Sequence, residues 1–144
     1  PAALSGMARL YCNEGEYETA FDYLTKAAAL GDVYAHYNLS LSYHKGEGVE
    51  KDEEKKLYHL EEAAIRGHPE ARYNLACIEM MNDRFVRAVK HHIIAANLGY
   101  DDSIQMLKKC YKYGDVSKED FAAARRGHQA AVDATKSPQR EAAS

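Results

Sequence analysis

The 144-residue sequence has no tryptophan, only three prolines and three cysteines, and no long apolar run. The scarcity of proline, with 46% hydrophobic and 28% charged residues, indicates one ordered, helix-rich domain. No stretch approaches the roughly 20 apolar residues that a membrane-spanning helix needs, and no secretory signal is recognisable. We therefore expect no membrane partner and a cytoplasmic or nuclear location. The proline at position 1 leaves a truncated N-terminus open.

Neither sign of charge dominates the sequence. Its 19 lysines and arginines stand against 22 aspartates and glutamates, which gives a formal net charge of −3. Proteins that bind nucleic acid usually carry a clear excess of basic residues on one face. We therefore expect no nucleic-acid partner.

The cysteines are too few and too far apart for a metal site or a disulfide framework. Cys12, Cys77 and Cys110 are odd in number and include no closely spaced pair, whereas zinc sites and disulfide-rich folds need such pairs. We interpret all three as reduced thiols in the core.

The histidines and the candidate nucleophiles show no catalytic or metal-binding pattern. His91 and His92 are adjacent on a predicted helix, so they point in different directions. The other five have no partner at ligand spacing: His36, His44, His59, His68 and His128. No serine or cysteine can be paired with a base, and no pair of carboxylates stands out. The sequence therefore predicts a protein that is not an enzyme, with no catalytic residue, metal or cofactor.

One short pattern, Ala-Ala-x-x-Gly, occurs four times, at residues 27–31, 63–67, 95–99 and 123–127. After each of the first three copies, a small residue and then a leucine follow at four-residue steps: Ala35 and Leu39, Ala71 and Leu75, Ser103 and Leu107. Paired alanines allow a neighbouring helix to come close, and a glycine after them can take the left-handed conformation that ends a helix. The pattern predicts repeated units that end in tight turns, over residues 1–31, 32–67, 68–99 and 100–127.

Apolar residues recur at three- and four-residue steps within these units, as on one face of an amphipathic helix. We expect eight helices, near residues 3–13, 16–30, 32–45, 52–66, 68–81, 84–98, 100–113 and 118–136. A single helix pair cannot bury its apolar stripe, whereas stacked pairs cover one another. The predicted fold is all-α, a right-handed α-α superhelix of about four helix-pair repeats within residues 1–136.

The last predicted helix caps the stack at its C-terminal end. It should begin with a capping box at Ser117 and Asp120. Pro138 should end it, because proline lacks a backbone N–H and clashes with the preceding turn. We expect residues 137–144 to be a flexible tail.

A glycine-containing loop lies within the second unit, over residues 46–52. A phosphate-binding loop needs the pattern GxxxxGK[ST] between a strand and a helix. Here Gly46 and Gly48 stand two apart, Lys51 is followed by Asp52, and helices are predicted on both sides. We interpret the loop as an optional spacer between two helices, with Asp52 capping the second of them.

These units resemble the Sel-one-like repeat (SLR) family, a branch of the tetratricopeptide-like (TPR-like) helical repeats. The resemblance covers about residues 4–127 and is carried by Ala35-His-Tyr-Asn-Leu39, Gly46-Glu-Gly48-Val49, Glu62-Ala-Ala64 and Ala71-Arg-Tyr-Asn-Leu75. The third unit lacks the Gly-x-Gly-Val loop, and the cysteine pair that staples each repeat in some members is missing. The resemblance implies a non-catalytic interaction scaffold or adaptor whose partner is a protein or a peptide.

Repeats of this kind commonly bind extended peptides on a concave wall formed by the first helix of each pair. The resemblance places fourteen residues on that wall: Tyr34, Tyr37, Leu41, His44, Lys45, Glu70, Tyr73, Cys77, Met80, Met81, Gln105, Lys109, Lys112 and Tyr113. Tyrosine and methionine suit adaptable recognition, because they offer large contact areas with amphipathic or soft ends. The alternative is that some of these residues pack between neighbouring helices.

Asn38 and Asn74 need separate consideration. In some related repeats an inward asparagine grips the terminal carboxylate of a peptide, together with basic side chains from adjacent units. Arg9, Lys45 and Lys109 stand nearby in register but do not repeat that arrangement. We interpret both asparagines as structural, bonded to backbone.

A basic stripe is predicted on the outer side of one helix, formed by Arg84, Arg87, Lys90 and His91. Such a stripe either docks an acidic partner or, more commonly, is a solvated face.

Two other functions stay open at the level of the sequence. The repeats could be one region of a larger regulatory protein with an upstream domain. They could also form a weak hydrolase like some cysteine-rich relatives, although the missing cysteine pairs count against this.

Overall fold

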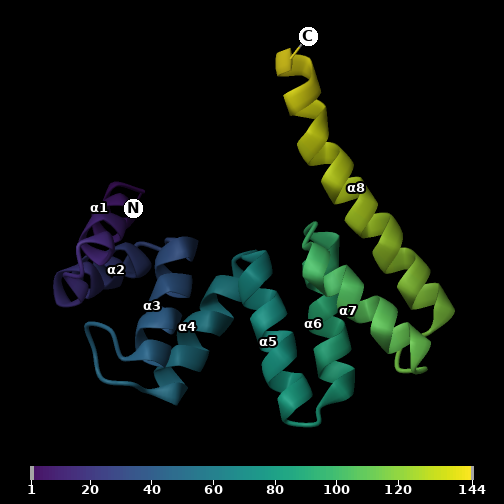
Figure 1. Cartoon of the computed structure of the whole chain (residues 1–144), viewed down its shortest axis with the longest axis horizontal. Helices are drawn as coiled ribbons and strands as arrows, with labels where there is room; N and C mark the ends of the chain where they lie inside the picture. Colours follow the sequence, from purple (N-terminus) through teal and green to yellow (C-terminus); the bar gives the residue numbers. More distant parts are fainter. Residues whose placement is uncertain (1, 144) are drawn as a thin grey trace. The chain divides into compact units, whose positions relative to one another are not determined.

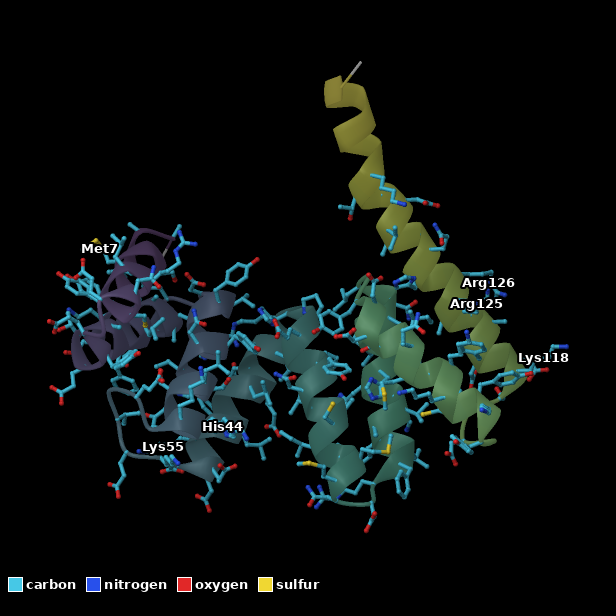
Figure 2. The ribbon with its side chains drawn as sticks, viewed as in Figure 1. Met7, His44, Lys55, Lys118, Arg125 and Arg126 are labelled. Carbon is cyan, nitrogen blue, oxygen red and sulfur yellow. The ribbon has the colours of Figure 1, made fainter. Side chains whose placement is uncertain are left out.

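The computed structural model describes the backbone of residues 2–143 and the side chains of residues 2–136. Over the described residues the chain forms eight α-helices and no strand (Figure 1). Their bounds are α1 Ala2–Asn13, α2 Tyr17–Ala29, α3 Val33–Lys45, α4 Glu53–Ile65, α5 Pro69–Met81, α6 Phe85–Asn97, α7 Asp101–Lys112 and α8 Lys118–Ala143. The predicted all-α fold of helix-pair repeats is confirmed. Figure 2 adds the side chains, with Met7 on α1 and Lys118 at the start of α8.

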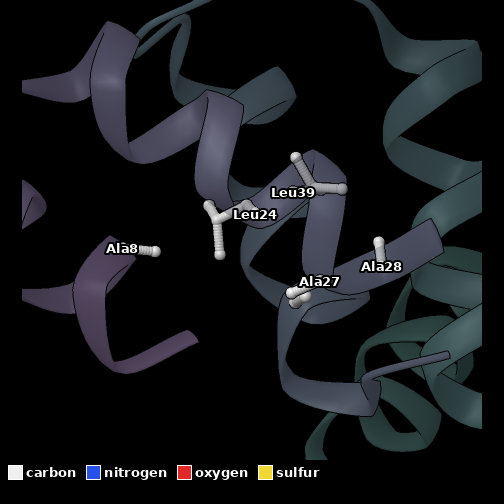
Figure 3. Close-up of a cluster of buried hydrophobic side chains, with 6 residues drawn as sticks. Ala8, Leu24, Ala27, Ala28 and Leu39 are labelled. Carbon is white, nitrogen blue, oxygen red and sulfur yellow. The ribbon is translucent and has the colours of Figure 1, made fainter. Parts of the chain in front are cut away.

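The chain divides into two compact units, Pro1–Ala71 and Arg72–Ser144, and each has its own hydrophobic cluster. The cluster of the first unit joins α1, α2 and α3 (Figure 3) and consists of Ala8, Leu24, Ala27, Ala28, Ala35 and Leu39. The cluster of the second unit consists of Val89, Ala96, Leu107, Cys110, Val116 and Ala124. The small side chains in both clusters let the helices approach closely, as the alanine pairs predicted.

The end of α2 shows how the helix pairs are closed. Gly31 has φ +87°, and the N–H of the next residue, Asp32, donates to the Ala27 carbonyl at 3.1 Å. A residue with positive φ, followed by a hydrogen bond from the next N–H to the carbonyl five residues earlier, is the Schellman motif that ends a helix. The same bond recurs after α4 and α6, from His68 to Ala63 at 3.0 Å and from Tyr100 to Ala95 at 3.1 Å. The predicted tight turns are confirmed for the first three copies of the pattern.

The fourth copy does not end a helix, contrary to the turn that its sequence suggests. Gly127 lies inside α8, and a Cβ atom there would come within 1.7 Å of the Asn97 side-chain oxygen. The glycine therefore provides space for the end of α6 rather than a turn. The start of α8 is as predicted, since the Asp120 N–H donates to the Ser117 hydroxyl oxygen at 3.0 Å.

The predicted end of the last helix near residue 136 is wrong. The backbone of α8 continues through Pro138 to Ala143. A proline removes one intrahelical hydrogen bond without preventing helical dihedral angles on either side of it, because its own φ is close to the helical value. The flexibility of residues 137–144 stays a prediction.

The loop that joins α3 to α4 (Figure 1) approaches the start of α2 and is not a free spacer. A Cβ atom at Gly48 would lie only 2.3 Å from the backbone oxygen of Tyr17, in the first turn of α2. The loop then leads into the predicted cap of α4, where the Asp52 carboxylate accepts the Lys55 N–H at 3.0 Å. The interpretation of this loop as an optional spacer therefore missed its contact with α2.

Candidate binding groove

A groove of about 590 Å³ opens in the first unit between α1 and α3, and we call it the α1–α3 groove. Four residues of α3 line it at the spacing of one helix face: Tyr34, Asn38, Leu41 and Lys45. Six residues of α1 line it as well, and Ser5, Arg9 and Cys12 among them have the same periodicity. The two helix faces therefore form opposite walls of one groove.

The groove has an apolar floor and room above it. Ala8 and Leu24, at its base, are only 1% and 2% exposed and belong to the hydrophobic cluster. Gly6 lies on the α1 wall, and a Cβ atom at that position would meet nothing within 4 Å. Small residues on α1 thus leave space for a side chain of a ligand.

Charges of both signs line the groove. Arg9 and Lys45 contribute positive charge, and Asp32 and Glu47 contribute carboxylates. Asp32 is already engaged, because it accepts the Tyr34 N–H at 2.9 Å and a hydrogen bond from the Ser5 hydroxyl. Arg9 and Lys45 form no ion pair with the described residues, so both are available to a ligand.

The surroundings of Asn38 differ from the prediction that its side chain bonds to the backbone. It is exposed in the groove, and within the described part of the chain its side-chain amide makes no hydrogen bond. Arg9 and Lys45 line the same groove, so the structure brings together three residues that the sequence could only place in register. Asn74, by contrast, is half-buried in the second unit.

Three residues of the predicted wall line the groove, namely Tyr34, Leu41 and Lys45, and Tyr34 is 67% exposed. Tyr37 has different surroundings, because its ring stacks on His68 with centroids 4.3 Å apart. The Nδ1 atom of His68 accepts the Ala71 N–H at 3.1 Å and so caps the start of α5. Burial lowers the pKa of His68, which keeps this nitrogen available as an acceptor. Tyr37 therefore helps to hold a turn.

Two other predicted wall residues, His44 and Glu70, are exposed outside the groove. The Nδ1 atom of His44 lies 4.0 Å from the Glu53 carboxylate.

In the second unit the predicted wall residues fall into two groups. Tyr73 packs against the rings of His92 and Tyr100, at centroid distances of 5.4 and 5.3 Å, and burial together with a hydrogen bond to Cys77 raises the pKa of its hydroxyl to about 12. Met80 packs against the hydrophobic cluster. The exposed group consists of Met81, Gln105, Lys109, Lys112 and Tyr113.

The predicted basic stripe is only partly free. Arg84 and Arg87 both approach the same carboxylate oxygen of the buried Glu79, at 3.5 and 3.6 Å. The guanidinium group of Arg72 lies 3.2 Å from the His91 ring nitrogen. The stripe is therefore tied to α5 at three of its four positions.

A second hollow in the first unit, of about 510 Å³, contains a histidine pair that the sequence analysis missed. The Nδ1 atoms of His36 and His59 are 3.0 Å apart, so one ring donates and the other accepts. Burial lowers the pKa of both rings, that of His59 to about 4. The residues are 23 positions apart on two different helices, and only the packing of α3 on α4 brings them together.

The described residues include no group of three or more metal-ligating side chains that could hold an ion. The three cysteines are free, as predicted, but only Cys110 is buried. Cys12 and Cys77 are half-exposed, and the interpretation of these two as core thiols is wrong. None of the described helices is long and apolar enough to cross a membrane.

Comparisons with known proteins agree with this architecture. A family model described as "Sel1 repeat" matches residues 1–32, 33–68 and 69–100. Among solved structures, a Sel1 repeat protein from Oxalobacter formigenes is similar with a TM-score of 0.74 and 23% identity over 92% of this chain. A protective antigen of uropathogenic Escherichia coli strains, which displays an SLR fold, is similar with a TM-score of 0.67 and 22% identity over 92% of this chain.

The chain spans 58% of the first of these two proteins and 30% of the second. At this level of identity the likeness shows the fold alone. The comparison with curated proteins gave no match. The three consecutive family matches cover residues 1–100, more than half of the sequence, and they follow the helix pairs of the structure. The chain therefore belongs to the Sel1 repeat family.

Proposed function

We propose that this chain is a non-catalytic interaction scaffold that binds an extended peptide, or an extended segment of a protein, in the α1–α3 groove. Sel1 repeat proteins are commonly protein-interaction scaffolds. The observation that carries the proposal is the groove itself, in which Tyr34, Leu41 and the apolar floor lie beside the cationic Arg9 and Lys45.

The chemistry of the lining favours a ligand with mixed character. An exposed tyrosine next to a leucine offers contact area for an apolar side chain at low entropic cost. Asn38 and the two cations can bond backbone carbonyls or an acidic group on the same segment. An extended segment presents both kinds of group along its length.

The exposed residues of the second unit extend the proposal. Met81 and Tyr113 are 78% and 75% exposed, and Lys112 lies over the Tyr113 ring at 6.0 Å. We propose that these residues, with Gln105 and Lys109, contact the partner as well. Tyr73 and Met80 contribute by supporting the helix that carries Met81.

A peptide selected from a random library on the whole chain tests the groove. We expect Tyr34→Ala and Leu41→Ala each to raise the Kd of that peptide roughly ten-fold, as for hot-spot side chains. Matched controls lie on α4, outside the groove: Tyr58→Ala and Leu57→Ala remove side chains that are 55% and 37% exposed. Fluorescence anisotropy measures the Kd of the peptide for each variant. If the α4 variants weaken peptide binding as much as the α3 variants do, the peptide does not bind in the α1–α3 groove.

The non-catalytic part of the proposal has its own test. A panel of chromogenic ester and lactam substrates should show no turnover above buffer with the purified chain. Hydrolysis that rises in proportion to protein concentration and survives further purification would favour the hydrolase alternative.

A further inference from the structure

A second groove, of about 320 Å³, lies in the second unit along the seam between α7 and α8. We call it the α7–α8 groove. We propose that it binds an acidic peptide segment through the carboxylates of that segment, independently of the α1–α3 groove.

The floor of the α7–α8 groove is apolar. Ile104 and Phe121 line it, and both pack against the hydrophobic cluster of the second unit. The floor is therefore held in place by the core and can accept an aliphatic side chain. Its volume is at the small end of ligand pockets, which suits a few side chains and not a folded domain.

The rim is cationic, and no carboxylate lines it. Lys108 on α7 and Arg125 on α8 stand on opposite sides of the seam, and in the described part of the chain neither forms an ion pair. The guanidinium group of Arg125 lies 5.8 Å from the centre of the Phe121 ring. A guanidinium group stacked on a ring keeps its in-plane N–H donors free for bidentate bonding to a carboxylate.

Polar side chains complete the lining at the other end. The amides of Gln105 and Gln129 line the groove, and Gln129 donates one hydrogen bond to Asp133 at 2.9 Å. His128 lies 2.6 Å from the Asp101 carboxylate, which is outside the lining and largely exposed. The two nearby carboxylates, Asp101 and Asp133, thus each already bind a polar side chain of the lining.

Charge complementarity selects the occupant. Two cations on separate helices, with amide groups in the same lining and an apolar floor, match a segment in which glutamates flank an aliphatic residue. The whole chain carries a net charge of −3, so this local excess of positive charge is not a general property of its surface.

The test is binding of a fluorescently labelled peptide of alternating glutamate and leucine to the full chain at low salt. We expect saturable binding that Lys108→Gln and Arg125→Gln each weaken roughly ten-fold, as for loss of one charge-assisted hydrogen bond. Lys118→Gln and Arg126→Gln are the control substitutions, because both side chains are exposed on α8 and lie outside the lining of the groove (Figure 2). These controls should change the Kd less than about two-fold.

Three outcomes would overturn the proposal: no saturable binding, equal weakening by all four substitutions, or binding only of a peptide with phosphoserine in place of glutamate. Tyr34→Ala should leave binding of this peptide unchanged. If the Tyr34→Ala variant no longer binds the peptide, the peptide binds in the α1–α3 groove instead. Lys108 is on the surface of α7, so Lys108→Gln should fold with unchanged helicity by circular dichroism.

Discussion

Replacing Gly48 with alanine should lower the free energy of unfolding by about 3 kcal/mol. Gly48 has φ +78°, a left-handed conformation that costs an alanine about 1 to 2 kcal/mol. In addition, the new Cβ atom would lie 2.3 Å from the backbone oxygen of Tyr17 and 2.7 Å from its carbonyl carbon. Backbone atoms at the start of a helix cannot move as a side-chain tip can, so the loop must detach from α2. Urea unfolding followed by circular dichroism measures the change.

Gly31→Ala is the matched control for this prediction. Gly31 has φ +87°, but a Cβ atom there would meet nothing within 4 Å. Gly31→Ala therefore measures the cost of the left-handed conformation alone, and we expect it to lower the free energy of unfolding by about 1 kcal/mol. If Gly48→Ala costs no more than Gly31→Ala, the contact between the loop and α2 contributes nothing to stability.

The Gly48 contact illustrates a limit of sequence reasoning about this chain. The sequence correctly placed a glycine-containing loop between two helices of the second unit. Local spacing says nothing about what such a loop touches, and Tyr17 is 31 positions away in the sequence. The inference that the loop does not resemble a phosphate site came from local spacing, whereas its packing depends on tertiary structure.

The helix pairs could be predicted because their signals are local. Each alanine pair followed by a glycine combines close packing with a closed helix end, and Ala27, Ala63 and Ala95 are all fully buried. Gly127 shows where the same signal fails. The three defining letters of the pattern are the same, but this glycine is required by the contact with Asn97 on another helix and not by a turn.

The candidate site was only partly predictable for the same reason. The α3 face of the groove follows from helical spacing, so Tyr34, Leu41 and Lys45 could be found from the repeat. The opposite wall depends on how α1 packs against α2 and α3, and Cys12 was accordingly mistaken for a core residue. Tyr37 lies on the same helix as these residues, but its ring stacks on His68 and does not line the groove.

Acid should destabilise the second unit through His92, by about 2 to 3 kcal/mol between roughly pH 7 and pH 4.5. His92 is 0% exposed, and burial, followed by the charge of His91, lowers its pKa to about 4 from an ordinary value of 6.5. Below about pH 6.5 the unfolded chain binds a proton at this ring and the folded chain does not, so stability falls as the pH falls toward 4. Well above pH 6.5 both states are neutral and the ring makes no pH-dependent contribution.

The packing around His92 explains why its charged form is excluded. Its Nδ1 atom lies 3.3 Å from the Ser103 hydroxyl, and its Nε2 atom is buried without a hydrogen-bond partner in the described structure. A proton on both nitrogens would add a charge with no acceptor at Nε2, and among the described residues no carboxylate is paired with the ring. The neutral ring is therefore the only form that the site accommodates at low cost.

His92→Gln removes the titrating ring and keeps a group that can bond Ser103. We expect this variant to be less stable near neutral pH, yet to lose about 2 to 3 kcal/mol less than the parent chain on acidification. Ser103→Ala retains the ring and should keep the full pH dependence. Urea unfolding at the two pH values distinguishes the variants, because the comparison uses the change within each protein and not its absolute stability. A parent and a His92→Gln variant with equal acid sensitivity would assign the effect to the other buried histidines, of which the pair His36 and His59 is the strongest alternative.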